Sequence, residues 1–254
     1  MRNPARILYI PLVACLLVGG PSAVRAAEGL YLTWNDCAPG AGATRDRGSD
    51  CTSETGQQNL YCAFGVPASL DSVLGLELVV DVQSADPVLA DWWRFDPGAC
   101  REGNLRAGFV FPSPSPCGDF LDGNAAGGLQ GYYPNEPRGG ANQARIKVAA
   151  SLLESVAGYA SLDSEGTYYA ARLTITNTRT IGTGACAGCL QPVCLVFNSI
   201  TVLRQPGAAG GDQFLSEPGP GQANWATWQG GLGADCVAVP VRAVTWGRIK
   251  GLYR

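Results

Sequence analysis

The 254-residue sequence contains no histidine, one methionine and only two lysines, Lys147 and Lys250. Without histidine the chain has no Ser-His-Asp or Cys-His catalytic arrangement and no histidine-ligated metal centre. Arginine carries nearly all of the positive charge. These absences leave carboxylate chemistry as the main catalytic option and favour a binding or structural role.

Acidic residues outnumber basic ones. The chain has 21 acidic and 18 basic residues, and three of the arginines fall within residues 1–26, so the remainder carries a net charge of −6. Proteins that bind nucleic acid gather Lys and Arg on one face to neutralise phosphates. We therefore expect no nucleic-acid partner. The hydrophobic content of 46% is enough for a buried core.

The N-terminus has the pattern of an export signal. Two arginines precede an apolar run over residues 7–20, and Val24-Arg25-Ala26 places small residues at the −3 and −1 positions of a signal-peptidase site. We expect residues 1–26 to be a signal peptide. A second interpretation is a lipoprotein signal, because Leu12-Val13-Ala14-Cys15 resembles a lipobox with Cys15 as the lipidated residue.

The remaining chain has no run approaching the ~20 apolar residues of a membrane span, so no transmembrane segment is expected in it. Secretion, display at the cell surface or a periplasmic location is therefore predicted. Residues 27–254 contain no internal repeat and no composition typical of a linker, which predicts one domain.

Alternating apolar and polar residues predict strands. In residues 74–82, five apolar side chains at every second position share one face, while Glu77 and Asp81 lie on the other. Further strands are expected over residues 30–34, 60–64, 106–111, 145–148, 169–176, 193–203 with a bulge near Asn198-Ser199, and 237–244. Short helices are expected only over 149–157 and 246–253. The sequence predicts an all-β antiparallel sandwich, of jelly-roll or immunoglobulin/cohesin-like type, with disulfide-stapled loops and little helix.

Nine cysteines follow the predicted signal. Exported β domains rich in loops are commonly stabilised by disulfides. Closeness along the chain predicts the pairs Cys37–Cys51 and Cys100–Cys117. Cys186, Cys189, Cys194 and Cys236 allow three pairings, of which Cys186–Cys194 with Cys189–Cys236 is slightly favoured. Cys62 lies within an expected strand and is predicted to be a buried free thiol.

The Cys186-Ala187-Gly188-Cys189 motif has two further interpretations. With Cys194 and Cys236 it has a spacing that a Cys₄ zinc site permits. A redox role requires such a motif at a helix N-terminus, whereas this one lies in a glycine-rich loop between two expected strands. In an exported chain disulfides are the preferred interpretation, and we expect no metal and no cofactor.

Aromatic residues in turn-rich segments suggest a binding surface. Trp92 and Trp93 are adjacent, so in a strand at most one of them would fill the core. Tyr132 and Tyr133 lie in a segment expected to be a loop, and Trp228 flanks a glycine-rich stretch. Flat aromatic faces suit sugar rings or a protein partner. These five residues are the predicted ligand contacts, although packing in the core is the simpler explanation for each tryptophan.

Catalysis would have to rest on carboxylates, as in glycoside hydrolases, whose two acidic groups stand roughly 5–9.5 Å apart. Glu77 and Asp81 share a strand face about 13 Å apart, which is too far. Asp91 with Asp96, or Asp163 with Glu165, would come closer, but all four are also typical of loops and turns. No catalytic residue is therefore predicted.

The segments Trp34-Asn35-Asp36-Cys37, Trp92-Trp93-Arg94-Phe95 and the cysteine-containing loop at 184–189 resemble a group of uncharacterised exported bacterial proteins. The order of the expected strands is similar to that of cohesin-like and carbohydrate-binding sandwiches, which implies a fold and no particular function. The distinctive C-terminal segment, residues 245–254, resembles tails of such proteins that imply a sorting or attachment role. A segment that packs on the sandwich is the alternative.

Three functions follow in order of preference. The first is a secreted or surface-displayed, non-enzymatic binding or structural module that recognises a glycan or an envelope protein. The second is a carboxylate-dependent glycoside hydrolase, and the third is a purely architectural envelope protein. The third ranks close to the first.

Overall fold

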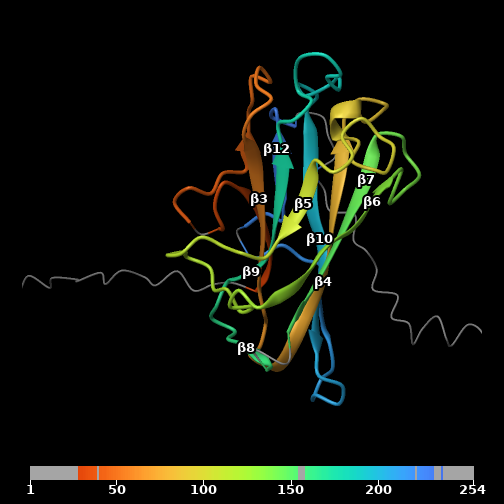
Figure 1. The fold of residues 1–254 in the computed structure, drawn as a ribbon. Helices are drawn as coiled ribbons and strands as arrows, with labels where there is room; N and C mark the ends of the chain where they lie inside the picture. The colour runs from red at the N-terminus through yellow and green to blue at the C-terminus, as the bar shows by residue number, and fades with distance from the viewer. Residues whose placement is uncertain (1–27, 39, 154–157, 221, 232–235, 237–254) are drawn as a thin grey trace, which may run out of the picture.

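The computed structural model describes residues 28–38, 40–153, 158–220, 222–231 and 236 (Figure 1). The predicted signal peptide with Cys15, the strand expected over 237–244 and the segment 245–254 lie outside these residues. In the described part the chain forms strands and one 3-10 turn, η1 (Asp91–Trp93). The strands are β1 (Gly29–Trp34), β2 (Asp46–Arg47), β3 (Gln57–Gly65), β4 (Leu70–Ser84), β5 (Leu105–Gly108), β6 (Ala125–Pro134), β7 (Gln143–Leu152), β8 (Ala160–Leu162), β9 (Tyr168–Thr176), β10 (Val193–Arg204), β11 (Gln213–Leu215) and β12 (Trp225–Trp228).

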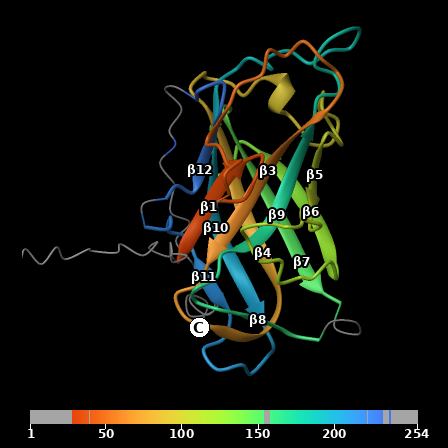
Figure 2. The same cartoon turned by 90° about the vertical axis from the view of Figure 1, so that its left-hand side faces the viewer.

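The strands form two sheets, which confirms the all-β sandwich. The smaller sheet has the order β1-β3-β9-β5, and the larger has the order β2-β12-β10-β4-β7-β6, with β11 and β8 added beside β10 and β4. Figure 2 shows the smaller sheet in front of the larger one. The pairs are antiparallel except β2 with β12, which is parallel.

The alternation in the sequence decides which face each strand buries. In β4, Leu76, Leu78, Val80 and Val82 are buried against the smaller sheet, and Glu77 points to solvent. The central strand β10 is apolar on both faces, and its pairing with β4 shifts between Phe197 and Ser199. The bulge expected near Asn198 is therefore confirmed. An extra residue at this point lets Phe197 enter the core while Asn198 bonds Asp81 on the opposite face.

Three segments differ from expectation. The predicted helix over 149–157 is wrong in its described part, because β7 continues as a strand to Leu152 between β4 and β6. The segment around Tyr132 and Tyr133 was expected to be a loop but forms β6 at the edge of the larger sheet. The strand expected over 106–111 is shorter, Leu105–Gly108.

One large apolar core lies between the sheets and includes four fully buried tryptophans, namely Trp34, Trp92, Trp93 and Trp228. A second cluster covers the outer side of the smaller sheet, where Phe111 stacks on Tyr169 with ring centres 4.1 Å apart. In the described residues no helix has the length and apolar character needed to cross a membrane.

Candidate functional site

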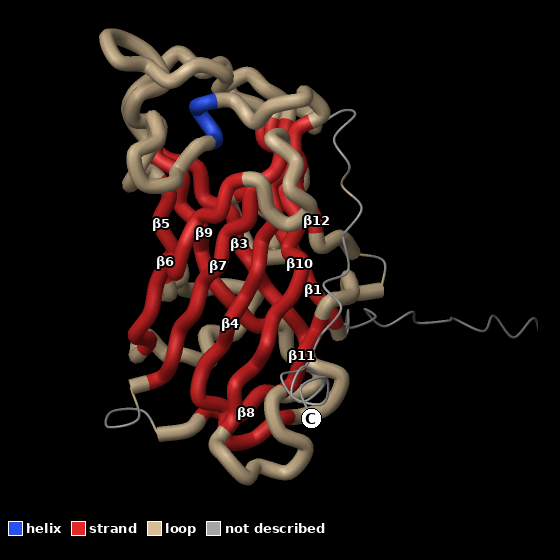
Figure 3. The backbone as a smooth tube through the Cα atoms, turned by 90° about the vertical axis from the view of Figure 1, so that its right-hand side faces the viewer, coloured by secondary structure: helices blue, strands red, loops and turns tan. Residues whose placement is uncertain are grey.

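Loops 48–56, 85–104 and 177–192 gather at one end of the sandwich, the upper end in Figure 3. We call it the loop end. Two disulfides join these loops: Cys51–Cys189, with Cα atoms 6.0 Å apart, and Cys100–Cys186, with Cα atoms 5.9 Å apart. Loop 177–192 is thus covalently bonded to both of the other loops. Its conformation, and that of its neighbours, is fixed by bonds between segments 138 and 86 residues apart in sequence.

All four predicted disulfide pairings are wrong. The structure pairs Cys37 with Cys117, Cys51 with Cys189, Cys100 with Cys186 and Cys194 with Cys236, in place of Cys37–Cys51, Cys100–Cys117, Cys186–Cys194 and Cys189–Cys236. Three of the four predictions took cysteines that are close along the chain as partners. Hairpins and crossings between the sheets instead bring distant segments within bonding distance. Cys62 is free and buried in β3, as expected, and burial raises the pKa of its thiol.

The Cys186-Ala187-Gly188-Cys189 motif therefore contributes one sulfur to each of two disulfides. Neither a zinc site nor a CxxC redox pair is formed by these sulfurs, and the described residues contain no cluster of three or more metal-ligating side chains. Gly188 is needed for close packing. Its φ is 96°, and a Cβ there would run into Ala90. The amide of Trp92 donates to the Ala187 carbonyl, 2.9 Å away.

The buried tryptophans pack beneath the loops of the loop end and donate hydrogen bonds to one of them. Trp92 stacks on Trp228 with ring centres 5.1 Å apart, and Trp93 packs edge-on against both. The indole N–H of Trp228 donates to the Cys189 carbonyl at 2.6 Å, and that of Trp92 donates to the Thr180 hydroxyl at 3.1 Å. The tryptophans thus fix loop 177–192 through hydrogen bonds as well as by packing.

The prediction that Trp92, Trp93 and Trp228 contact a ligand is wrong for the structure described, because all three have no exposed surface. The expectation that at most one of Trp92 and Trp93 fills the core assumed that they lie in a strand. They form the 3-10 turn η1 instead. Successive side chains of such a turn are about 120° apart instead of 180°. Both indoles can therefore enter the same core.

Arg101 is the most unusual charged residue near the loop end. It is fully buried, and its guanidinium carbon lies 3.9 Å from the centre of the Trp92 ring. It donates to the carbonyls of Trp92 and Thr176, while Nε finds no acceptor among the described residues. Burial lowers its pKa from 12.5 to about 10. The cation is held by the ring and two carbonyl dipoles.

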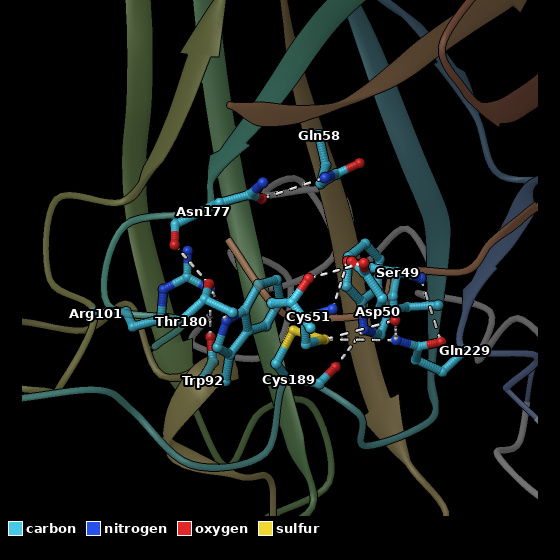
Figure 4. Close-up of a disulfide and its surroundings, with 12 residues drawn as sticks. Ser49, Asp50, Cys51, Gln58, Trp92, Arg101, Asn177, Thr180, Cys189 and Gln229 are labelled. Atoms are coloured by element: carbon cyan, nitrogen blue, oxygen red, sulfur yellow. Dashed lines mark hydrogen bonds between the residues drawn. A yellow bond between two sulfur atoms is a disulfide. The ribbon is translucent and has the colours of Figure 1, made fainter. Parts of the chain in front are cut away.

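A chain of polar contacts surrounds the Cys51–Cys189 disulfide (Figure 4). On one side, the Gln58 amide donates to Asn177 at 3.2 Å, and the Thr180 hydroxyl donates to the Asn177 carbonyl at 2.5 Å. On the other side, the Gln229 amide donates to the Ser49 carbonyl and lies 3.6 Å from the Cys51 sulfur. The loops are therefore held together by side-chain hydrogen bonds beside the covalent link.

The surface above this support is apolar. Cys51, Thr180 and residues 185–190 line an open, shallow depression. Leu190 is 63% exposed at its rim, and Val88, on the neighbouring loop, is 55% exposed. The Gln191 side chain fixes the two loops to each other, since its amide donates to the Val88 carbonyl at 2.9 Å and its oxygen accepts from the Ala90 amide at 2.8 Å.

The two predicted tyrosines lie apart from this surface. Tyr132 is buried, its hydroxyl donates to the Trp93 carbonyl, and burial raises its pKa. The prediction of a ligand contact at Tyr132 is therefore wrong. Tyr133 is 37% exposed on the outer face of the larger sheet. Its ring lies over Gly131, and the Lys147 ammonium is 4.5 Å from the ring centre.

Two of the most buried carboxylates are paired with arginines. Asp81 accepts two hydrogen bonds from Arg145, at 2.7 and 2.9 Å, and another from Asn198. Asp96 accepts two from Arg94, each at 3.0 Å, which lowers the pKa of Asp96 and raises that of Arg94. A general acid needs a raised pKa, so the arrangement at Asp96 is that of a structural ion pair.

Sequence reasoning missed Arg101, Thr180, Val88 and Leu190. Arg101 stands in an ordinary turn sequence, and no pattern marks it as buried. Leu190 could have been found from the sequence. It is a large apolar residue in a glycine-rich loop, and it belongs to no alternating apolar pattern that would bury it.

No family model matches the chain, and no curated protein does. Among solved structures, the chain is similar to one described as "AvmM Catalyzes Macrocyclization in Alchivemycin A Biosynthesis". The identity is 10%, the match covers 75% of this chain and 89% of that one, and the TM-score is 0.30. A likeness this low carries no argument about function. The resemblance to exported cohesin-like sandwiches stays a prediction.

Proposed function

We propose that the chain is an exported, non-enzymatic binding module that contacts a protein partner through its loop end. The observation that carries the proposal is the exposure of Val88 and Leu190 on two loops that are fixed to each other and to the core. Large apolar side chains in solvent next to an apolar depression are typical of interaction sites. Four disulfides are typical of proteins in oxidising compartments, which supports export.

Rigidity of the loop end favours binding. A flexible loop loses about 0.5–1.5 kcal/mol for each side chain that it immobilises on association. Here Cys51–Cys189, Cys100–Cys186 and the tryptophans beneath them order the loops before any partner arrives. Apolar contact at Val88 and Leu190 would then contribute to affinity with little ordering cost.

Glycan binding is the second candidate, and Tyr133 is the observation that favours it. Its ring is the one exposed aromatic face among the five predicted contacts. The Lys147 ammonium already lies 4.5 Å from that ring, so a sugar would compete with an internal cation–π contact. At the loop end, Val88 and Leu190 are 55% and 63% exposed in the described part of the chain, which is why the protein partner is preferred.

The hydrolase and purely architectural hypotheses rank lower. A glycosidase needs two carboxyl groups facing one cleft, with one of them available as an acid. Asp81 and Asp96 are each engaged by an arginine. An architectural role would leave the exposed apolar residues of the loop end without a purpose.

The test compares two variants of the exported chain. Val88→Ser with Leu190→Ser removes both apolar contacts, and Leu153→Ser removes an exposed leucine at the opposite end as the control. Partners are captured from envelope extract by wild type, identified, purified and measured by interferometry. We expect the double variant to bind at least about 10-fold more weakly and the control within about 2-fold. Equal binding by all three, or glycan binding abolished by Tyr133→Ala, would contradict the proposal.

A further inference from the structure

The last described strand of the chain ends at the loop end. Trp228, the final residue of β12, lies opposite Val193 at the start of β10. The next residue, Gln229, donates to the Ser49 carbonyl and lies 3.6 Å from the Cys51 sulfur (Figure 4). Because Cys51 lines the apolar depression, the chain leaves β12 next to that surface.

A disulfide then holds the start of the C-terminal segment, residues 237–254, at the same end. Cys236 is bonded to Cys194, the second residue of β10, with Cα atoms 5.5 Å apart. Leu190 precedes Cys194 by four residues, which span at most about 14 Å. The segment therefore begins within about 20 Å of Leu190, and its 18 residues can extend over about 60 Å. It is long enough to reach both exposed apolar residues of the loop end.

The exposed charges of the loop end are mostly negative. Its three loops carry one exposed basic residue, Arg179, and five exposed acidic residues. The acidic residues are Asp50, Glu54, Asp86, Asp91 and Glu102. Asp86 lies close to the apolar residues, because it accepts a hydrogen bond from the same Gln191 amide that bonds the Val88 carbonyl. A cation placed beside Val88 would therefore meet a carboxylate.

The C-terminal segment has the complementary composition. Its sequence, VAVPVRAVTWGRIKGLYR, contains four basic residues and no acidic one. Basic and large apolar residues are interspersed, with Arg248 and Lys250 on either side of Ile249 and with Trp246 and Tyr253 flanking them. Apolar side chains carrying a charge opposite to that of the loops are what this surface selects.

We propose that the loop end binds the chain's own C-terminal segment, residues 237–254, with apolar side chains of the segment against Val88 and Leu190 and a basic group beside Asp86. This inference rests on the proposed function, since the segment occupies the surface proposed for a protein partner. The tether gives the segment an effective concentration of about 1 mM, so an intrinsic Kd of about 100 µM would leave it docked in about nine of ten molecules. A partner then has to displace the segment, which makes the docking autoinhibitory.

The chain has only two lysines, which makes a crosslinking test specific. A carbodiimide joins a lysine ammonium to a carboxylate in contact with it as an amide, with loss of water and no added spacer. Lys250 lies in the segment, and Lys147 on β7, with its ammonium 4.5 Å from the Tyr133 ring, is the internal control. The exported chain is treated at low micromolar concentration, and linked peptides are identified in the monomer. We expect Lys250 to link to Asp86 or to another exposed carboxylate of the loop end.

Tryptic cleavage after Arg248 measures the strength of docking, because trypsin cuts only the undocked segment. Val88→Ser with Leu190→Ser should weaken docking at least about 10-fold and so speed this cleavage at least about 5-fold. Leu153→Ser, which removes an exposed leucine at the opposite end, should change the rate by less than about 2-fold. Thermal unfolding checks that each variant folds.

Three results would overturn the proposal. Links from Lys250 to Glu77 or to other carboxylates of the sheet faces would place the segment elsewhere. Links that join only separate chains would make a second copy the occupant of the loop end. An absence of Lys250 links, with equal cleavage of wild type and both variants, would show that the segment does not dock.

These results are separable from the test of the proposed function. If the segment does not dock but capture of an external partner still depends on Val88 and Leu190, only the present inference fails. If the segment docks but capture of a partner is independent of the two residues, only the proposed function fails.

Discussion

The Arg101 guanidinium lies over the Trp92 ring at 3.9 Å, and both residues are completely buried. Their contact joins the segment before β5 to the tryptophans that support the loop end. Because the cation is held by a ring and two backbone carbonyls, its removal leaves both a cavity and two acceptors without donors.

Arg101→Ala should therefore lower the free energy of unfolding by about 3 kcal/mol, measured by urea denaturation. Arg106→Ala is the matched control, since Arg106 is exposed on β5 and its loss should change stability by less than about 0.5 kcal/mol. Equal stability of the two variants would show that Arg101 is not buried as described.

Trp93→Ala and Tyr133→Ala separate core packing from exposure. Trp93 is fully buried, so its truncation should cost about 3–5 kcal/mol of unfolding free energy. Tyr133 is partly exposed and should cost less than about 1 kcal/mol. Thermal unfolding of the two variants measures the difference. A folded, fully stable Trp93→Ala protein would argue that the indole lies at the surface.

Much of the fold could be predicted, because the alternation of apolar and polar residues along a strand shows which side chains are buried. β4 alternates over nine residues, and the two-sided apolar pattern of β10 indicated a central strand. β6 escaped notice because its glycines and alanines have low strand propensity, and only its pairing with β7 makes it a strand. The Ala149-Ala150 pair favours helix locally, yet pairing with β4 overrides that preference.

The candidate site was less predictable because it depends on contacts between distant segments. Which cysteines pair depends on how the two sheets pack against each other. The sequence does not show which loops this packing brings together at the end of the sandwich. The adjacent tryptophans illustrate the second difficulty. Their common burial depends on the turn η1, and a strand with the same two residues would separate them.

Cys62 should be unreactive in the folded protein. It is fully buried in β3, and the same burial raises the pKa of its thiol, so little thiolate forms at neutral pH. Titration of the unreduced chain without residues 1–26, and so without Cys15, should give no fast reaction with a thiol reagent in buffer and one thiol per chain in denaturant. Two or more thiols in denaturant, or rapid labelling without it, would contradict this assignment.

The Arg94–Asp96 pair should contribute a pH-dependent part of stability. Its hydrogen bonds lower the pKa of Asp96 below 3.8 in the folded state, so the contribution is present above that value and is lost as pH falls through the lowered pKa. The pair is partly exposed, so Asp96→Asn should cost about 0.5–1 kcal/mol at pH 7 and less at pH 2.

Urea denaturation at the two pH values measures this difference. Glu77→Gln, which removes an exposed carboxylate from β4, shows the effect of losing a negative charge alone. A penalty for Asp96→Asn that stayed the same at both pH values would rule out the ion pair as its source.

Peptide mapping of the unreduced protein tests the covalent structure of the loop end most directly. Digestion at neutral to mildly acidic pH, with free thiol blocked, should give linked peptides that join Cys51 to Cys189 and Cys100 to Cys186. Linked peptides that join Cys37 to Cys51 or Cys186 to Cys194 would contradict the account, since loop 177–192 would then no longer be bonded to the loops on either side of it.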